Sequence, residues 1–284
     1  MTGSLGLRLV QHDRADAAQQ AALEAAAGTV PASFHLTESA DDPHIAWVFG
    51  GQGWEQRVEA ALQAGALAVV LDAAGPFGPA DVEAFRGSPV VLAGTRTHAP
   101  QLRDLASRLP ALGDLAFIEV LVVDDASQAQ PAAALWDIVA MLTAAGLHID
   151  SVPLVTVGEQ AVMAETFVGT ARAHLSYVCR EGAVPRASIK VFSAQGSVEA
   201  TMGDPTVALP GRVLAVGAKD ASLSSTAYVT PRRVALEEVH ATVARGLTPP
   251  GLLELHAHAA SLLSQVLWAG GEQTTPTQLE GTNR

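Results

Sequence analysis

The sequence predicts two successive architectures in one chain, a parallel α/β part followed by an open antiparallel β-sheet part with helices (α/β + α+β). Two observations predict this order. Up to residue 112, short apolar runs alternate with amphipathic helices, which is typical of a parallel sheet. After Gly113, strand-like segments separated by glycine-bearing turns dominate. We therefore expect domains over residues 1–112 and 113–269, and a polar, disordered tail over residues 270–284.

The first part is organised around the stretch from Ile45 to Gly75. It begins with the apolar run Ile45–Phe49, typical of a strand buried on both faces, and continues through a glycine-rich turn at Gly50–Gly53. An amphipathic helix starts at Trp54, and the apolar strand Ala66–Leu71 follows. Such a βαβ unit is right-handed, and ligands bind beyond the carboxyl ends of its strands. The turn and the residues after Leu71 should therefore line any pocket.

The remaining elements follow from the same periodicities. In the first part we expect strands or helices at Leu7–Gln11, Ala15–Ala27, Pro79–Arg86, Pro89–Ala93 and Ala99–Leu109, with a short helical turn at Glu38–Asp42. In the second part we expect strands at Ala116–Val123, Val152–Val157, Phe167–Cys179, Ala187–Phe192, Val198–Met202, Val213–Val216 and Ser222–Val229. Helices are expected at Ala132–Ala145, Pro231–Arg245 and Pro250–Leu267.

Composition excludes several classes of protein. The 284-residue chain has a formal net charge of −12, which argues against binding to nucleic-acid phosphates. No apolar run is long enough to span a bilayer, and no basic amphipathic helix indicates a membrane surface. The first residues do not have the pattern of a signal peptide, so we expect a cytoplasmic protein. Cys179 is the only cysteine in the sequence, so we expect no internal disulfide and no cysteine-rich metal site.

Five segments together resemble the Gfo/Idh/MocA oxidoreductases, which join a dinucleotide-binding Rossmann domain to an open antiparallel sheet domain. Asp41–Phe49 resembles the segment entering that family's "vDaVvvatP" strand, and Ala60–Leu71 resembles its "AleAGkhVlvEKP" segment. Thr95–Pro100 is similar to "N-R-R-F-x-P". Trp136–Gly146 has the length of "H-D-I-D-L-L-R-W-L-L-G", and Ile189–Ala200 is similar to the family's "i-x-v-x-G-x-x-G-s-l" hairpin. The resemblance implies a Rossmann-like first domain.

Three elements that the family uses with NAD(P) are not found in the sequence. Val10–Asp13 resembles the family's second strand, so the chain is expected to be truncated, without the first βα unit and its GxGxxG loop. The family's E-K-P lysine would fall near Leu71–Ala74, whereas the chain's two lysines are Lys190 and Lys219. Trp136 replaces the family's proton-handling histidine. The resemblance therefore predicts that NAD(P) is not bound in the family's way, and we expect no cofactor.

The candidate site lies at the carboxyl ends of the predicted parallel strands. Asp72, His98 and Asp137 are the candidate acid/base groups, because carboxylates and imidazole can transfer protons. The candidates for substrate binding are Phe49, Gly50, Gln52, Trp54, Arg96 and Trp136. Other interpretations remain open, since Asp72 could cap a turn, Asp137 could be favoured by the dipole of its helix, and His98 could be an ordinary loop residue.

The antiparallel sheet is the predicted surface for association. An open sheet that is apolar on both faces should be covered by another part of the protein or another subunit, so we expect a homo- or hetero-oligomer, such as a dimer. The candidate residues for that face, or for the core beneath it, are Val168, Leu175, Tyr177, Ile189 and Val191. His174 and Ser176 share one face of their strand, where an interface or core role is favoured over catalysis.

Three functions remain open at this point. The first is a cofactor-independent lyase, cyclase or isomerase that binds a small organic molecule between the domains. The second is a non-catalytic partner subunit of an active oxidoreductase or another enzyme. The third is an atypical NAD(P)-dependent oxidoreductase.

Overall fold

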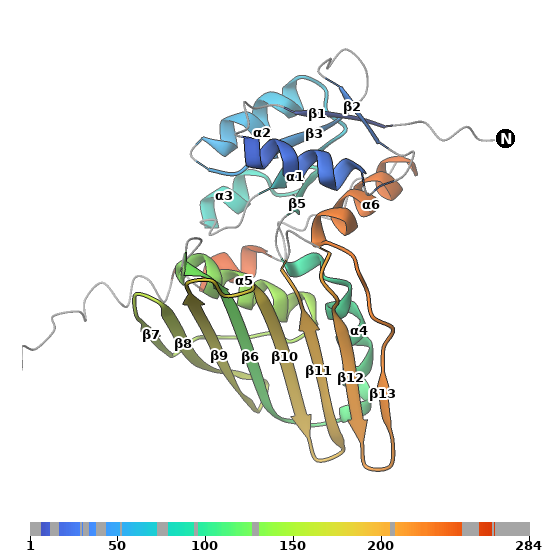
Figure 1. Cartoon of the computed structure of the whole chain (residues 1–284). Helices are drawn as coiled ribbons and strands as arrows, with labels where there is room; N and C mark the ends of the chain where they lie inside the picture. The colour runs from blue at the N-terminus through green and yellow to red at the C-terminus, as the bar shows by residue number, and fades with distance from the viewer. Residues whose placement is uncertain are drawn as a thin grey trace, which may run out of the picture.

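The structure is a computed structural model that places two β-sheets one above the other, with helices between and around them (Figure 1). It describes residues 7–11, 17–28, 30, 34–37, 44–51, 53–72, 79–93, 96–126, 131–204, 208–245, 256–262 and 264. The fold class expected from the sequence is confirmed, because a parallel α/β sheet is followed along the chain by a larger, mainly antiparallel sheet.

The upper sheet has five strands in the order β2-β1-β3-β4-β5, and all neighbouring pairs are parallel. The strands are β1 (Leu7–Gln11), β2 (Phe34–Thr37), β3 (His44–Phe49), β4 (Ala68–Asp72) and β5 (Val90–Ala93). Every residue of β3 is buried, as expected for a strand with helices on both faces of its sheet.

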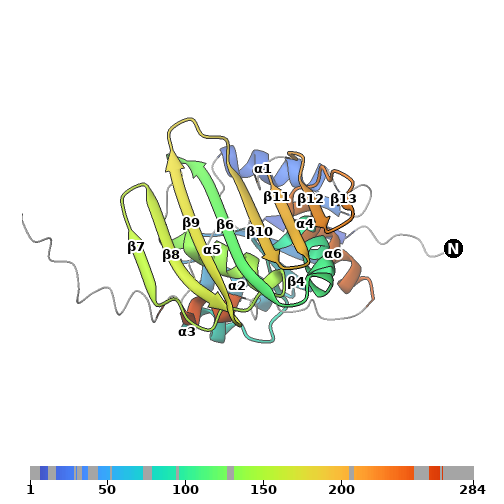
Figure 2. The ribbon, with the colours of Figure 1, turned by 90° about the horizontal axis from the view of Figure 1, so that it is seen from below.

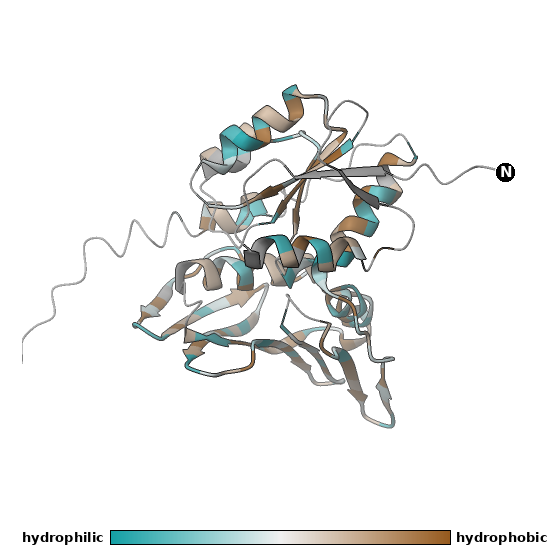
Figure 3. Cartoon of the chain, turned by 45° about the horizontal axis from the view of Figure 1, so that its top comes forward, coloured by the Kyte–Doolittle hydropathy of each residue, from teal (hydrophilic) through white to brown (hydrophobic). Residues whose placement is uncertain are grey.

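Helices cover both faces of this sheet, because alternate residues of each strand point to opposite sides. On one face, Trp47 and Val70 pack with residues of α1 (Ala17–Gly28) and α6 (Pro231–Val243). On the other face, Val48 and Leu71 pack with residues of α2 (Trp54–Gln63) and with the region of α3 (Pro79–Ala84). In Figure 3 the helices around the upper sheet carry both teal and brown segments, as amphipathic helices do.

The lower sheet has eight strands in the order β13-β12-β11-β10-β6-β9-β8-β7. Neighbouring strands are antiparallel except for β6 and β9, which are parallel. The strands are β6 (Leu115–Asp125), β7 (Leu154–Val157), β8 (Ala161–Val168), β9 (Ala171–Arg180), β10 (Arg186–Ser193), β11 (Gly196–Met202), β12 (Arg212–Gly217) and β13 (Ala221–Leu223).

The two faces of the lower sheet have different environments. The inner face packs against α5 (Pro131–Ala144) and α4 (Pro100–Arg108), with Ile118, Leu175 and Ile189 buried in that core. Two short 3₁₀ turns, η1 (Arg96–His98) and η2 (Leu109–Leu112), precede and follow α4. The outer face is seen from below in Figure 2, and none of the described helices lies over it.

Some element boundaries differ from those predicted. β2 lies in a stretch predicted to be turn-rich, and the predicted strand Phe167–Cys179 is divided between β8 and β9. The division falls at Gly169, whose positive φ of 58° begins a reverse turn. The predicted turn Glu38–Asp42 and tail 270–284 lie outside the described residues. The domain limits at 112/113 and 269/270 stay predictions.

Candidate functional site

The carboxyl ends of β3 and β4 meet at one edge of the upper sheet. Phe49 pairs in register with Asp72, and the Gly50 N–H donates a hydrogen bond to the Asp72 carbonyl oxygen at 2.8 Å. Gly51 and Gly53 have φ values of 114° and 76°, which side chains disfavour, so this turn depends on glycine. Gly53 caps α2 without a side-chain hydrogen bond, and the Trp54 N–H that begins the helix donates to the Gly51 carbonyl oxygen at 3.2 Å.

Two of the three aromatic residues predicted to bind substrate lie next to this turn. Phe49 and Trp54 are both buried, and the Trp54 ring packs on the Phe85 ring with centroids 5.3 Å apart. The Arg57 guanidinium Nη2 donates to the Phe49 carbonyl oxygen at 2.9 Å, which ties α2 to the end of β3. The predicted ligand Gln52 lies outside the described residues.

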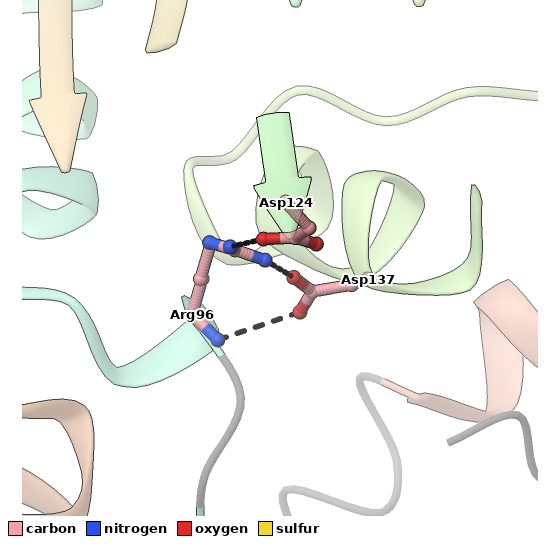
Figure 4. A network of polar contacts seen from close by, with 3 residues as sticks. All are labelled: Arg96, Asp124 and Asp137. Carbon is pink, nitrogen blue, oxygen red and sulfur yellow. Dashed lines mark hydrogen bonds and ion pairs between the residues drawn. The ribbon is translucent and has the colours of Figure 1, made fainter. Parts of the chain in front are cut away.

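Arg96 joins the two halves of the molecule through two carboxylates (Figure 4). From η1, its guanidinium Nη1 donates to Asp137 Oδ2 on α5 at 3.0 Å, and its Nη2 donates to Asp124 Oδ1 on β6 at 2.5 Å. The Arg96 N–H also points to Asp137 Oδ1 at 3.4 Å. All three side chains are largely buried, so the ion pairs are shielded from water.

One guanidinium between two carboxylates leaves one excess negative charge in a buried place. Burial raises the pKa of the Asp137 carboxyl even though Arg96 opposes the shift, and the charge of Asp124 adds to the increase. Burial alone would lower the pKa of the Arg96 guanidinium, but Asp137 and Asp124 outweigh burial and raise that pKa. Arg96 therefore stays charged, and Asp137 is the member of the network whose raised pKa favours protonation.

Asp72 is held by an arginine from the far end of the chain. Arg232, at the start of α6, places its Nε 3.2 Å from Asp72 Oδ1 and 3.1 Å from Oδ2. Burial raises the pKa of the Asp72 carboxyl, and the attraction and hydrogen bonds of Arg232 oppose that increase. Asp72 thus ties α6 to the edge of the upper sheet.

His98 and Trp136 meet partners that the sequence did not suggest. His98 Nδ1 lies 3.3 Å from Glu238 Oε2 on α6, and the pKa of Glu238 is lowered mainly by its hydrogen bond to His98. Trp136 is fully buried on α5, and its ring stacks on the His256 imidazole with centroids 4.2 Å apart. Burial, and to a smaller extent the electrostatic effect of His98, lowers the pKa of His256 to about 3.

The structure therefore gathers Asp72, Arg96, His98 and Asp137 at the junction of the two halves. Sequence reasoning missed the four residues that contact them or Trp136, which are Asp124, Arg232, Glu238 and His256. Beside Arg96 lies a small pocket whose lining includes Gln101, Met202, Asp204 and Pro231. This pocket lies between the start of α4 and the edge of the lower sheet.

Comparisons with solved structures identify the class of fold. The chain is similar to an oxidoreductase from Sinorhizobium meliloti, with a TM-score of 0.69 and 11% identity, over 95% of this chain and 98% of that one. It is also similar to the dehydrogenase MviM from Clostridium difficile, with a TM-score of 0.66 and 10% identity, over 93% and 99% of the two chains. No family model and no curated protein matches the chain.

A third similar structure bears on the cofactor. KijD10, a 3-ketoreductase from Actinomadura kijaniata in complex with TDP-benzene and NADP, has a TM-score of 0.66 and 15% identity, over 91% of this chain and 96% of that one. The fold is thus the two-domain oxidoreductase fold that the resemblance implies. The expectation that no cofactor is used is contradicted, because it rested on departures from this family and a structure with the same fold holds NADP.

The expected loss of the first βα unit is not confirmed either. The strand order reverses between β1 and β3, so β1 stands beside the switch point where the phosphate loop of a Rossmann sheet follows its first strand. The chain also covers 96% and more of the three structures above. The sequence after Gln11 is HDRAD and contains no glycine.

In the part of the chain that the structure describes, no group of three or more histidine, cysteine, aspartate or glutamate side chains could hold a metal ion. Within the same residues, no helix is long and apolar enough to cross a membrane.

Proposed function

We propose that this chain is an oxidoreductase that binds a nicotinamide dinucleotide at the carboxyl ends of β1 and β3 and acts on a small organic molecule. The observation that carries the proposal is the strand order β2-β1-β3-β4-β5, whose reversal between β1 and β3 creates the crevice where such sheets bind nucleotides. The likeness to an NADP-bound ketoreductase supports it.

The described residues at this crevice fit a dinucleotide in part. Gly50, Gly51 and Gly53 leave room for close approach to the backbone, and the first amides of α2 face the same edge. An acid, Glu55, lies in the first turn of α2 and would repel a phosphate, whereas Arg57 on the same helix would attract it. These residues therefore fit a dinucleotide whose phosphates accept hydrogen bonds from backbone amides at the end of β3.

The proton-transfer role is best assigned to His98. Asp72 and Asp137 are each held by an arginine, whereas His98 Nε2 has no hydrogen-bond partner among the described residues. Glu238 accepts from the opposite ring nitrogen and so favours the tautomer in which Nε2 carries a lone pair. When an alcohol is oxidised, a bound nicotinamide would accept the hydride, and His98 Nε2 would accept the hydroxyl proton in place of the absent lysine.

Titration calorimetry with NADH and with NADPH tests the proposal. We expect a micromolar dissociation constant for at least one of them, because that is the usual range for substrates and cofactors of enzymes. Gly53→Val should weaken this binding at least about tenfold, since its Cβ would lie 3.3 Å from Gln56 Oε1 and its φ is disfavoured.

A matched control separates binding from damage to the fold. Gly65, at the other end of α2, also has a positive φ of 88°, so Gly65→Val imposes a comparable backbone strain away from the crevice. We expect Gly65→Val to bind the dinucleotide like the wild type. Absence of heat with either dinucleotide at millimolar concentration would contradict the proposal.

One observation favours a second function, that of a non-catalytic partner subunit. All four charged or titratable side chains predicted at the site, Asp72, Arg96, His98 and Asp137, are engaged with arginines or carboxylates. Ion pairs of this kind stabilise one arrangement of the elements that they join, and this role requires no catalysis. Co-purification of a stoichiometric partner from the native host, together with no dinucleotide binding, would support this second function over the first.

A further inference from the structure

Arg232 places a guanidinium group that is held at one end at the carboxyl edge of the upper sheet. Its Nε donates to the two carboxylate oxygens of Asp72 at 3.2 and 3.1 Å, and its side chain is only 15% exposed. Among the described residues, its terminal nitrogens Nη1 and Nη2 have no hydrogen-bond partner, and neither is closed off from solvent. A guanidinium with both terminal nitrogens open binds an oxyanion through two parallel N–H groups.

Arg96 shows, in the same junction, what such nitrogens bind. Its Nη1 and Nη2 each donate to one carboxylate, that of Asp137 at 3.0 Å and that of Asp124 at 2.5 Å (Figure 4). Arg232 binds one carboxylate through Nε, so the atoms that Arg96 uses for carboxylates are open to a carboxylate of another molecule. Arg232 is also the second residue of α6, and the N-terminal end of a helix favours an anion.

The ends of β4 and β5 bring Arg232 and His98 to the same edge. Asp72, which holds Arg232, ends β4 and pairs in register with Ala93, which ends β5. His98 follows β5 in η1, and Glu238 of α6 lies beside its Nδ1. Because neighbouring strands are about 4.8 Å apart, we expect one small molecule to reach both Arg232 and His98.

We propose that the substrate is a hydroxy acid, whose carboxylate binds the terminal nitrogens of Arg232 and whose hydroxyl group donates to His98 Nε2. This inference rests on the proposed function, because the hydroxyl is the group that is oxidised. The O–H bond and the adjacent C–H bond break, the proton goes to His98 and the hydride to the nicotinamide. The product is an oxo acid whose carboxylate is unchanged.

The charge of Arg232 selects a carboxylate over other groups at this position. An ammonium group would be repelled by the guanidinium. An uncharged diol would form neutral hydrogen bonds with it, which are about half as strong as those of a carboxylate. Recognition of the acid therefore depends on one side chain that does not take part in the proton transfer.

Paired ligands test the preference for a carboxylate. Lactate and 3-hydroxybutyrate carry the hydroxyl at different distances from the carboxylate, and 1,2-propanediol and 1,3-butanediol are their uncharged counterparts. Titration calorimetry of each, with and without saturating NADH or NADPH, measures binding without turnover. We expect at least one acid to bind at least about tenfold more tightly than its diol.

Three variants separate binding from a purely structural role. Arg232→Met should raise the dissociation constant of that acid at least about tenfold and leave that of the diol unchanged. The matched control, Arg233→Met, changes the net charge equally and breaks a partly exposed pair with Glu237, so it should bind the acid like the wild type. Asp72→Asn breaks the same buried pair as Arg232→Met but keeps the guanidinium, so it should still bind the acid. Thermal unfolding checks that each variant is folded.

Three results would overturn the inference. The first is an equal loss of acid binding in Asp72→Asn and Arg232→Met, because the pair would then act only through the fold. The second is no preference of the wild type for either acid over its diol. The third is an Arg232→Met variant that loses affinity for the dinucleotide and not for the acid, since the guanidinium would then serve a phosphate. Acid binding that depends on Arg232, without binding of either dinucleotide, would support the carboxylate site and contradict only the proposed redox function.

Discussion

The junction between the two halves and the outer face of the lower sheet both carry rows of charge, but in different surroundings. At the junction, Arg96 is 7% exposed and its two carboxylate partners are 20% exposed or less. On the outer face, Lys190 and its partners are at least 36% exposed. The same residue types are thus buried and paired in one place and open in the other.

This difference assigns different physical roles to the two regions. A buried ion pair whose partner is removed leaves a charge in a poor solvent, so the pairs at the junction hold α5, α6 and η1 in one arrangement. An exposed pair contributes little to folding, but its pattern can select a partner and fix its orientation. The sequence alone does not distinguish the two, since both are charged residues at the ends or on the faces of strands.

The largest expected effect is at the junction. Arg96→Met should lower the free energy of unfolding by about 3–5 kcal/mol, because Asp124 and Asp137 would remain buried without their cation. Urea denaturation followed by circular dichroism measures this loss. The control is Arg86→Met, which breaks an exposed pair with Glu83 and should cost less than about 1 kcal/mol. Equal losses in the two variants would show that the junction is not a special environment.

The second effect is a pH dependence from His256. Its pKa of about 3 in the folded protein lies below its ordinary value of 6.5, so below pH 6.5 the unfolded chain binds a proton that the folded protein does not. Stability should therefore fall as pH decreases from 6.5 toward 3, by up to about 1.4 kcal/mol per pH unit.

His256→Phe isolates this contribution. The raised pKa values of Asp72 and Asp137 act in the opposite direction, because a folded carboxyl that binds its proton more readily gains stability as pH falls. Subtracting the free energy of unfolding of His256→Phe from that of the wild type cancels the contributions of Asp72 and Asp137. The remaining difference should decrease steadily below pH 6.5. A difference that stays constant with pH would contradict the buried, neutral state of His256.

The smallest effect is on the outer face. Lys190→Met should change the free energy of unfolding of the monomer by less than about 1 kcal/mol, since its ion pairs are long and exposed. Denaturation at a protein concentration low enough to give monomer measures this change. A loss as large as that of Arg96→Met would remove the contrast between the two regions.

The upper sheet was largely predictable from sequence, because β3 and β4 are continuous apolar runs with a glycine turn and an amphipathic helix between them. β2 was not, since Phe34–Thr37 is four residues long and only half apolar. The separation of β8 from β9 also escaped prediction. Its turn at Gly169 interrupts a segment that has strand-favouring residues on both sides, such as Phe167, Val168 and Tyr177.

The location of the candidate site was predictable from the sequence, but the ion-pair partners of its residues were not. Topology gathers the residues at the ends of β4, β5 and β6, so Asp72, Arg96 and His98 could be placed near one another. Their partners come from residues 28 to 160 positions away, such as Asp124 and Arg232, and periodicity carries no signal for such pairing. Leu175, Tyr177, Ile189 and Val191, predicted for the oligomer face or for the core beneath it, lie in the core, because their strands turn the alternate residues outward.

Hydrogen–deuterium exchange with and without NADH or NADPH tests the proposed position of the dinucleotide. We expect slower exchange on binding in peptides that cover the end of β3 and the start of α2, from Phe49 to Arg57. We expect no change in β10 and β11, which belong to the lower sheet. Unchanged exchange around Phe49–Arg57 at saturating dinucleotide would contradict the claim.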